Sequence, residues 1–172
     1  MTDEAAAPQV QPDDPHRAAM RATTKRIDRV NEWLLVGGAL PPSDYQRLSD
    51  AGITHVVDLR EDTEVDADPA RLEALGISRQ QVPVPNHGAP TAAQLEALAT
   101  WIDAKRDDAN VYVHCGGGFG RAATMAVALL ILSGSNVEKA IAQVRQARSE
   151  IRINDAQLAW LRAVEQDVRQ KS

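Results

Sequence analysis

The chain has 172 residues, 44% of them hydrophobic, which suits one globular domain with a sizeable core. Its formal net charge of −5 argues against binding to bulk nucleic acid or to an anionic membrane surface. A single cysteine excludes an internal disulfide and suits a reducing compartment, so we expect a cytoplasmic protein. The first residues lack the basic and apolar pattern of a signal peptide, and no apolar run is long enough to span a bilayer.

Strands and helices are predicted to alternate along most of the chain. Residues 1–24, rich in Ala, Pro, Asp and Gln, are expected to be a disordered tail, and residues 25–172 a single domain. Strands are predicted near residues 33–36, 54–59, 77–84 and 110–114. Helices are predicted near residues 42–50, 69–75, 91–102, 122–132, 137–145 and 155–168, with an acidic loop at 61–68. This order predicts an α/β fold with a central, mainly parallel sheet flanked by helices on both faces.

A glycine-rich segment joins the strand at 110–114 to the apolar helix that follows it. It reads His114-Cys115-Gly116-Gly117-Gly118-Phe119-Gly120-Arg121. The backbone N–H groups of such a turn can point inward and hold a phosphate-like anion, and its glycines permit positive φ and close approach. Cys115 could then act as a thiolate nucleophile, and Arg121 could bind two phosphoryl oxygens at once. Phe119 is expected to point outward, either to pack or to border the mouth of the loop.

A simpler interpretation makes Cys115 a small buried hydrophobe in an ordinary turn between a strand and a helix. The β-like run before it and the continuous apolar helix after it favour the chemical interpretation, because they supply the context that such a motif requires.

The segment resembles the signature of the cysteine-dependent protein tyrosine phosphatase superfamily, most closely its small dual-specificity-like members. That signature is His-Cys, five residues, Arg, then Ser or Thr, and it matches at His114, Cys115, Gly118, Gly120 and Arg121. Residues 33–38 and 52–60 also resemble the first strands of the family. The resemblance implies a phosphatase-like fold, a nucleophilic cysteine, a phosphate-binding arginine, and substrate contacts from the intervening residues, Gly116, Gly117, Gly118, Phe119 and Gly120.

Two positions depart from this pattern. The hydroxyl residue that assists breakdown of the phosphoenzyme in the family is replaced by Ala122. The aspartate expected as general acid on an upstream loop is replaced by Asn86, which could contact substrate but cannot donate a proton and become an anion. The adjacent His87 could act in its place, since histidine titrates near neutral pH, although an exposed loop histidine without a role is the commoner case.

Other polar residues have weaker signals. Asp58 follows a predicted strand at the sheet edge where ligands bind, and it could brace the site, serve as a substitute acid or anchor a loop. His114 is expected to lie behind the loop and to orient it. Arg145, Arg148 and Arg152 could attract an acidic substrate, although a solvated basic face is the commoner explanation. No residue cluster has metal-ligand spacing, so we expect no metal and no cofactor.

These features predict a phosphomonoester hydrolase that forms a phosphocysteine intermediate. The expected substrate is a phosphotyrosine or phosphoserine/threonine protein or a small phosphomonoester, with no nucleic-acid or membrane partner. The loop lacks the basic residues that lipid-directed family members usually carry, which makes a phosphoinositide less favoured. Two alternatives stay open: a phosphate-binding pseudophosphatase with little turnover, because of Asn86 and Ala122, and a rhodanese-like sulfur carrier.

Overall fold

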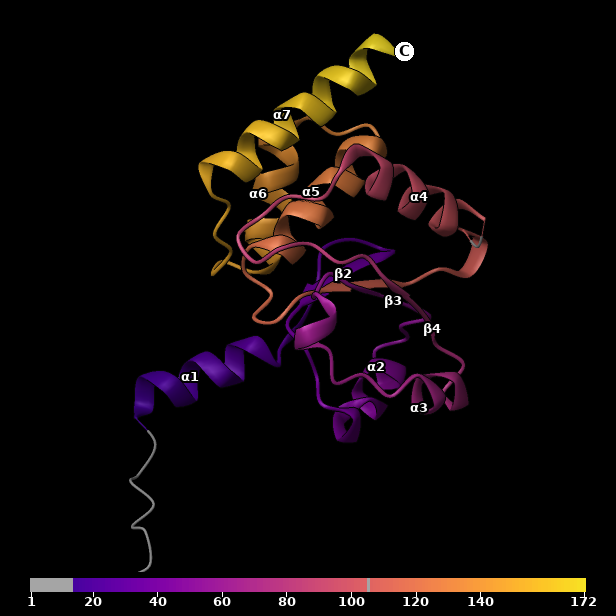
Figure 1. The fold of residues 1–172 in the computed structure, drawn as a ribbon, viewed down its shortest axis with the longest axis vertical. Helices are drawn as coiled ribbons and strands as arrows, with labels where there is room; N and C mark the ends of the chain where they lie inside the picture. The colour runs from indigo at the N-terminus through magenta and orange to yellow at the C-terminus, as the bar shows by residue number, and fades with distance from the viewer. Residues whose placement is uncertain (1–13, 105) are drawn as a thin grey trace, which may run out of the picture.

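The computed structural model describes residues 14–104 and 106–172, and its centre is a five-stranded sheet with the strand order β1-β2-β5-β3-β4 (Figure 1). The strands are β1 (Ile27–Arg29), β2 (Leu34–Gly37), β3 (His55–Asp58), β4 (Ser78–Gln81) and β5 (Val111–His114). β1 pairs antiparallel with β2, and every other neighbouring pair is parallel. The predicted α/β fold with a mainly parallel sheet is therefore confirmed.

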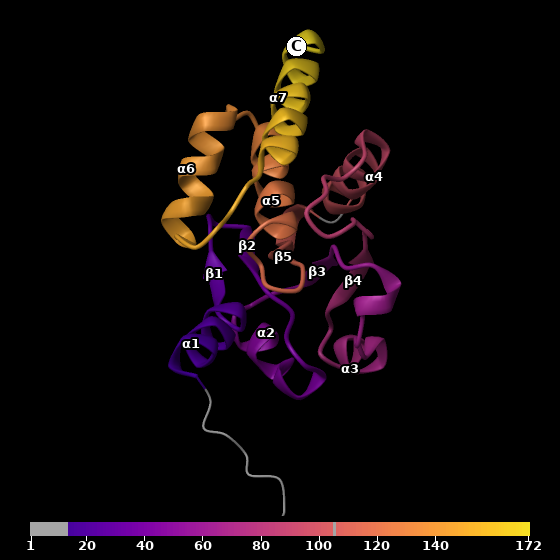
Figure 2. The same ribbon diagram turned by 60° about the vertical axis from the view of Figure 1, so that its left-hand side comes forward.

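Helices cover both faces of the sheet (Figures 1 and 2). One face carries the longer helices α4 (Ala92–Asp103), α5 (Arg121–Leu132), α6 (Val137–Ala147) and α7 (Asp155–Gln170). The other face carries α2 (Gln46–Asp50) and α3 (Pro69–Ala74). Single turns of 3-10 helix lie at Pro42–Asp44, Asp62–Glu64 and Arg106–Asp108. Because strand side chains alternate, Val113 packs in the cluster under the longer helices while Tyr112 packs in the other.

The position of the central helix α5 in the fold accounts for its apolar sequence. All of its residues except the last are buried, since it lies between the sheet and its helical neighbours α6 and α7. A helix buried on all sides needs no polar stripe. The flanking helices α4, α6 and α7 are preceded by the N-cap residues Thr91, Asn136 and Asn154, whose side chains accept a hydrogen bond from a backbone N–H of the first turn.

Two elements differ from the sequence-based expectation. A helix, α1, spans Pro15–Thr24, within the segment predicted as a disordered tail; the rest of that tail, residues 1–13, lies outside the described residues. Asp14 caps α1 and Pro15 is its first residue, so local signals form it although none of its residues is buried. Strand β1 was not predicted, because three residues are too short for an alternating pattern to be recognised.

The glycine-rich segment lies where β5 ends and α5 begins. β5 is the middle strand of the sheet, between β2 and β3. The loop therefore sits at the carboxyl edge of the parallel strands, which is the usual ligand-binding edge of such a sheet.

Candidate active site

The loop of residues 115–120 turns its carbonyl groups outward. Five consecutive carbonyl oxygens, those of residues 116–120, accept hydrogen bonds of 2.7 to 2.9 Å from outside the loop. The donors are the backbone N–H groups of Ala39, Thr124 and Arg152 and the guanidinium of Arg148. Because the C=O and N–H of one peptide unit point in opposite directions, the N–H groups of residues 117–121 are directed into the loop. The loop is thus a ring of inward donors, suited to an anion.

Cys115 lies at the centre of this ring. The backbone N–H of Gly118 donates to Cys115 Sγ at 3.2 Å. Gly118 has φ 80°, and a Cβ atom there would collide with the backbone of Gly37, so only glycine fits. The cysteine is free, and although it is buried it lines the cavity described below.

Arg121 begins α5 and turns its guanidinium back beneath the loop. Its Nη1 and Nη2 atoms donate to the two carboxylate oxygens of Glu64 at 2.9 and 2.8 Å, and Nη1 also donates to the Val84 carbonyl at 3.0 Å. The Nη2 atom lies 3.8 Å from where a Cβ on Gly116 would stand. Nε makes no hydrogen bond within the described residues and is not sealed from solvent. The Nε–Nη2 edge is therefore the edge that can receive an anion, while Glu64 holds the other.

Glu64 was not identified from the sequence, where it belongs to the acidic segment expected to be a loop. Its side chain is one-third exposed, and the hydrogen bonds from Arg121 hold its pKa at about 2, well below the ordinary value. It is ionised at neutral pH. A lone carboxylate far from the motif in sequence carries no spacing signal that could have singled it out.

Asp58 and His114 lie behind the loop, away from the cavity that Cys115 lines. Burial opposes the charge of Asp58, but hydrogen bonds from Arg60 and Arg79 at 2.9 Å prevail, and its pKa falls to about 2. Burial lowers the pKa of His114, so this side chain is neutral; its Nδ1 lies 3.1 Å from the Cys115 carbonyl and its Nε2 lies 3.8 Å from an Asp58 oxygen. Asp58 is thus an ionised anchor and not a proton donor.

Arg148 differs most from the sequence-based expectation of a solvated basic face. Its side chain is completely buried. It donates to the carbonyls of Gly117 and Gly118 at 2.9 Å each and to Asp28 at 3.0 Å, and its guanidinium lies 5.1 Å from the centre of the Phe119 ring. Arg148 therefore helps to turn the loop carbonyls outward. The apolar helical pattern ends near Arg148, and this was the only sequence signal that Arg148 does not lie on the exposed face of the helix.

The loop that carries Asn86 and His87 faces the glycine-rich loop across the cavity. His87 has φ 66°, a left-handed conformation uncommon for this residue, and its side chain is exposed. The start of α7 holds this loop in place. Asn154 donates to the His87 carbonyl at 2.8 Å, and the buried Gln157 donates to the Gly88 carbonyl at 2.9 Å. Neither Asn154 nor Gln157 was identified from the sequence.

One cavity of about 330 Å³ unites most of the predicted site residues. From the glycine-rich loop and the start of α5 it is lined by Cys115, Gly117, Phe119, Gly120 and Arg121, and from elsewhere by Asn86, His87, Arg152, Ile153, Asn154 and Gln157. Phe119 thus borders the cavity, as expected. Gly116, Gly118 and Ala122 do not line this cavity; the Gly118 N–H donates to Cys115 Sγ, and Ala122 is buried.

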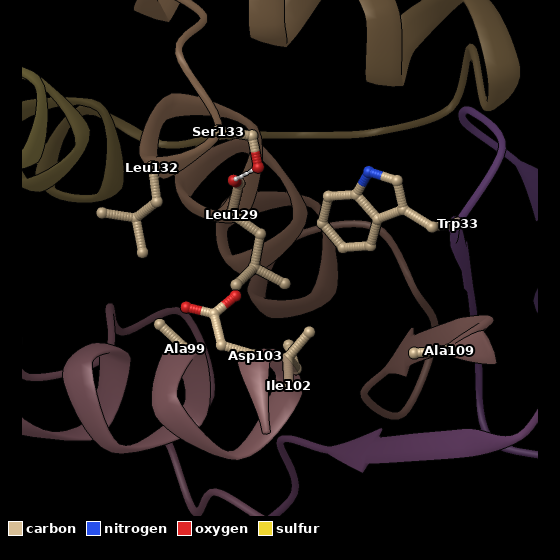
Figure 3. Close-up of a pocket in the computed structure, with 8 residues that line it drawn as sticks. All are labelled: Trp33, Ala99, Ile102, Asp103, Ala109, Leu129, Leu132 and Ser133. Atoms are coloured by element: carbon tan, nitrogen blue, oxygen red, sulfur yellow. Dashed lines mark hydrogen bonds between the residues drawn. The ribbon is translucent and has the colours of Figure 1, made fainter. Parts of the chain in front are cut away.

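A second cavity, of about 220 Å³, lies apart from this site between α4 and the end of α5 (Figure 3). Its lining is mostly apolar, with Trp33 on one side and Asp103 on another, and the Ser133 hydroxyl is satisfied by the Leu129 carbonyl at 3.0 Å. It shares no residue with the cavity around Cys115. Among the described residues, no group of three or more His, Cys, Asp or Glu side chains could hold a metal ion. None of the helices in residues 14–104 and 106–172 is long and apolar enough to cross a membrane.

The fold and the Cys-to-Arg loop at the carboxyl end of the central strand match the cysteine-dependent protein tyrosine phosphatase superfamily. More narrowly, residues 25–170 match the family described as "Swiss Army Knife protein, DSP-PTPase phosphatase domain", and the chain belongs to this family.

Similar proteins fall in the same superfamily. Phosphatidylglycerophosphate phosphatase PTPMT1 of Arabidopsis thaliana is 27% identical over 143 residues, which are 80% of this chain and 41% of that protein, so the chain spans less than half of that relative's length. The crystal structure of PTPMT1 in complex with PI(5)P superposes with a TM-score of 0.78 at 25% identity, covering 84% of this chain and 97% of that one. Tk-PTP in its active form gives a TM-score of 0.76 at 26% identity, covering 83% and 97%.

Proposed function

We propose that the chain hydrolyses phosphomonoesters through a covalent phosphocysteine intermediate. The ring of inward N–H groups around Cys115 Sγ supports this proposal most directly. The thiolate attacks phosphorus, and the S–P bond forms as the bond to the leaving oxygen breaks. The N–H groups and the free edge of Arg121 stabilise the equatorial oxygens. Water then cleaves the S–P bond and releases inorganic phosphate.

The leaving oxygen needs a proton when it belongs to a poor leaving group. Asp58 and Glu64 are both held ionised by arginines, so neither supplies one. Asn86 has no acidic proton to give. His87 lines the cavity next to Asn86 and is the titratable group on that wall, so we assign the proton to His87.

Hydrolysis of p-nitrophenyl phosphate tests this mechanism. Activity should survive EDTA, be inhibited by vanadate and vanish in Cys115→Ser. Rapid acid quench with labelled substrate should trap label on the wild type and none on the variant. Vanadate binding measured by calorimetry shows whether the variant keeps its folded loop. Full activity in Cys115→Ser would end the phosphocysteine proposal.

The pseudophosphatase alternative is tested by comparing leaving groups. If His87 gives the proton, as proposed, His87→Ala should make the rate fall steeply from p-nitrophenyl phosphate to phenyl phosphate, and Asn86→Asp should add little. If no group gives the proton, the wild type itself should show that steep fall, and Asn86→Asp should raise the phenyl phosphate rate by about 10² or more. Ala122→Ser should speed phosphoenzyme breakdown and shrink any burst of nitrophenolate. Vanadate binding without any phosphoenzyme would favour the pseudophosphatase.

Two substrate classes are candidates for this site. The phosphotyrosine or phosphoserine/threonine protein expected from the sequence stays a prediction. The Arabidopsis relative is named as a phosphatidylglycerophosphate phosphatase, and a similar PTPMT1 structure was solved with PI(5)P. These likenesses support a phosphorylated polyol headgroup instead, and we propose this second class. Release of phosphate from headgroup monoesters and from phosphotyrosine peptides, compared as kcat/KM, separates the two. The comparisons give no support to the rhodanese-like alternative, for which thiosulfate cyanolysis is the direct assay.

A further inference from the structure

The three arginines predicted as a possible basic face have three different environments. Arg145 is exposed on α6, and Arg148 is buried behind the loop. Arg152 is exposed and lines the cavity together with Cys115 and Arg121. Only Arg152 is therefore placed to meet a molecule that enters the cavity.

The backbone fixes Arg152 beside the anion-binding loop. Its N–H donates to the Phe119 carbonyl at 2.7 Å, and its own carbonyl lies 3.5 Å from where a Cβ on Gly120 would stand. The side chain thus begins at the rim of the loop. The side chain is exposed.

The charged groups around the cavity do not neutralise the guanidinium of Arg152. Within the described residues Arg152 forms no ion pair. Among the residues that line the cavity none is Asp or Glu; the other titratable groups there are Cys115, His87 and Arg121. Arg121 already has Glu64 as a partner, whereas Arg152 lines a cavity without a carboxylate. A cation in this position favours an anion from the ligand.

We propose that Arg152 binds a second anionic group of the substrate, so that the preferred substrate is a small polyol carrying a phosphomonoester and a further phosphate or phosphodiester. The inference rests on the proposed function. The phosphomonoester occupies the ring of N–H groups over Cys115, and the second anion meets Arg152 at the mouth. A guanidinium suits this role because its planar fork matches two oxygens of a phosphate or phosphodiester.

Binding to the Cys115→Ser protein tests the proposal without turnover. Calorimetry compares glycerol 1,3-bisphosphate with glycerol 3-phosphate, each affinity expressed per phosphomonoester. A hydrogen-bonded ion pair at a partly solvated mouth should favour the bisphosphate about tenfold, a preference that weakens as salt is added. Adding Arg152→Gln should bring the ratio close to one, and Arg152→Lys should keep part of it. Arg145→Gln, which replaces an exposed arginine outside the cavity, should keep the full ratio.

Lipid vesicles identify the source of the second anion. The same proteins are sedimented with phosphatidylcholine vesicles that carry either phosphatidylglycerophosphate or phosphatidylglycerol. Capture that requires both the terminal phosphate and Arg152 assigns the second anion to a lipid phosphodiester. Arg152-dependent binding of the soluble bisphosphate alone assigns it to a free polyol bisphosphate. Either result supports the proposal.

Three outcomes would overturn it: equal affinity for the two glycerol phosphates, a preference that Arg152→Gln leaves intact, or no binding of either compound. The peptide control compares a phosphotyrosine peptide that has Glu beside the phosphotyrosine with one that has Gln there. A preference found only between these two peptides, and not between the glycerol phosphates, would overturn the polyol assignment. Turnover of p-nitrophenyl phosphate and formation of phosphoenzyme by the wild type are measured separately. The absence of both would refute the proposed function and leave the binding result to be judged by itself.

Discussion

At the scale of single residues, the carboxylates around the loop form ion pairs with arginines and do not act on the substrate. Glu64 holds one end of the Arg121 guanidinium, and Asp58 is paired with Arg60 and Arg79 behind the loop. Both have a pKa of about 2, because the surrounding arginines favour the ionised form. These ion pairs orient the arginine side chains of the site, and their contribution to the free energy of unfolding should depend on pH.

Glu64→Gln should weaken the site by freeing Arg121. The guanidinium would lose its bidentate partner and keep only its bonds to backbone carbonyls. We expect kcat/KM for p-nitrophenyl phosphate to fall about tenfold, the value of one charge-assisted hydrogen bond. Glu73→Gln, an exposed substitution on α3, is the matched control and should change nothing. An unchanged kcat/KM in Glu64→Gln would show that Arg121 needs no such partner.

Asp58→Asn should destabilise the fold in a pH-dependent way. Removing a buried anion leaves Arg79 without its ion pair and Arg60 with Asp66 alone, a loss of about 3 kcal/mol in the free energy of unfolding at pH 7. Since the folded-state pKa of Asp58 lies below its ordinary value, the stabilisation is complete above about pH 4 and disappears as pH falls toward 2. Urea unfolding at pH 7 and pH 3 should therefore show a difference from wild type that shrinks on acidification. Asp107→Asn should show no difference, and a pH-independent loss in Asp58→Asn would contradict the ion-pair explanation.

The sequence could predict the residues of the motif and not their partners. Cys115 and Arg121 share one short segment with a recognisable spacing. Glu64 and Arg148 reach the same site from positions 57 residues before Arg121 and 30 residues after Gly118, and no local pattern links them to it. Their roles follow from topology, which brings separate chain segments to one edge of the sheet.

At the scale of elements, the active-site loops are held by the ends of helices. Arg148, just after α6, holds the glycine-rich loop from behind, and the first turn of α7 holds the Asn86–His87 loop. The sequence predicted these helices closely, because capping residues and apolar spacing are local signals. It missed α1 and β1, since α1 buries nothing and β1 is three residues long.

Arg148→Met should disorganise the glycine-rich loop. The carbonyls of Gly117 and Gly118 would lose their donor, so the N–H groups on the other side would no longer be held inward. Vanadate affinity, measured by inhibition of p-nitrophenyl phosphate hydrolysis, should fall at least about tenfold. The melting temperature should fall too, because the buried hydrogen bonds from Arg148 to Asp28 and to the Arg26 and Thr23 carbonyls are lost. Arg145→Met provides the matched control, and equal vanadate affinities in the two variants would refute the bracing role.

At the scale of the whole molecule, α1 is joined to the domain by hydrogen bonds at its last turn. None of its residues is buried, yet the Thr23 carbonyl accepts from Arg148 at 2.9 Å and the Thr24 carbonyl accepts from Gly38 N at 3.0 Å. The boundary between dispensable and required residues should therefore fall within the last turn of this helix.

Two truncations locate that boundary. Removal of residues 2–22 should change the melting temperature by less than about 2 °C, because none of the residues 15–22 that the structure describes as helix is buried. Removal of residues 2–24 should lower it by about 5 °C, since a buried guanidinium then lacks one acceptor. Differential scanning calorimetry of both proteins decides the matter. A large loss on removing residues 2–22 alone would mean that α1 or the preceding residues pack on the domain.

The bond from Arg148 to Thr23 joins residues 125 positions apart. During synthesis the N-terminal helix, the strands and Cys115 all leave the ribosome before Arg148 does. Until that arginine emerges and docks, the glycine-rich loop lacks the donor that turns its carbonyls outward. A partly made chain would therefore carry the nucleophile without a finished anion site, and chemical competence would arise only near the end of translation.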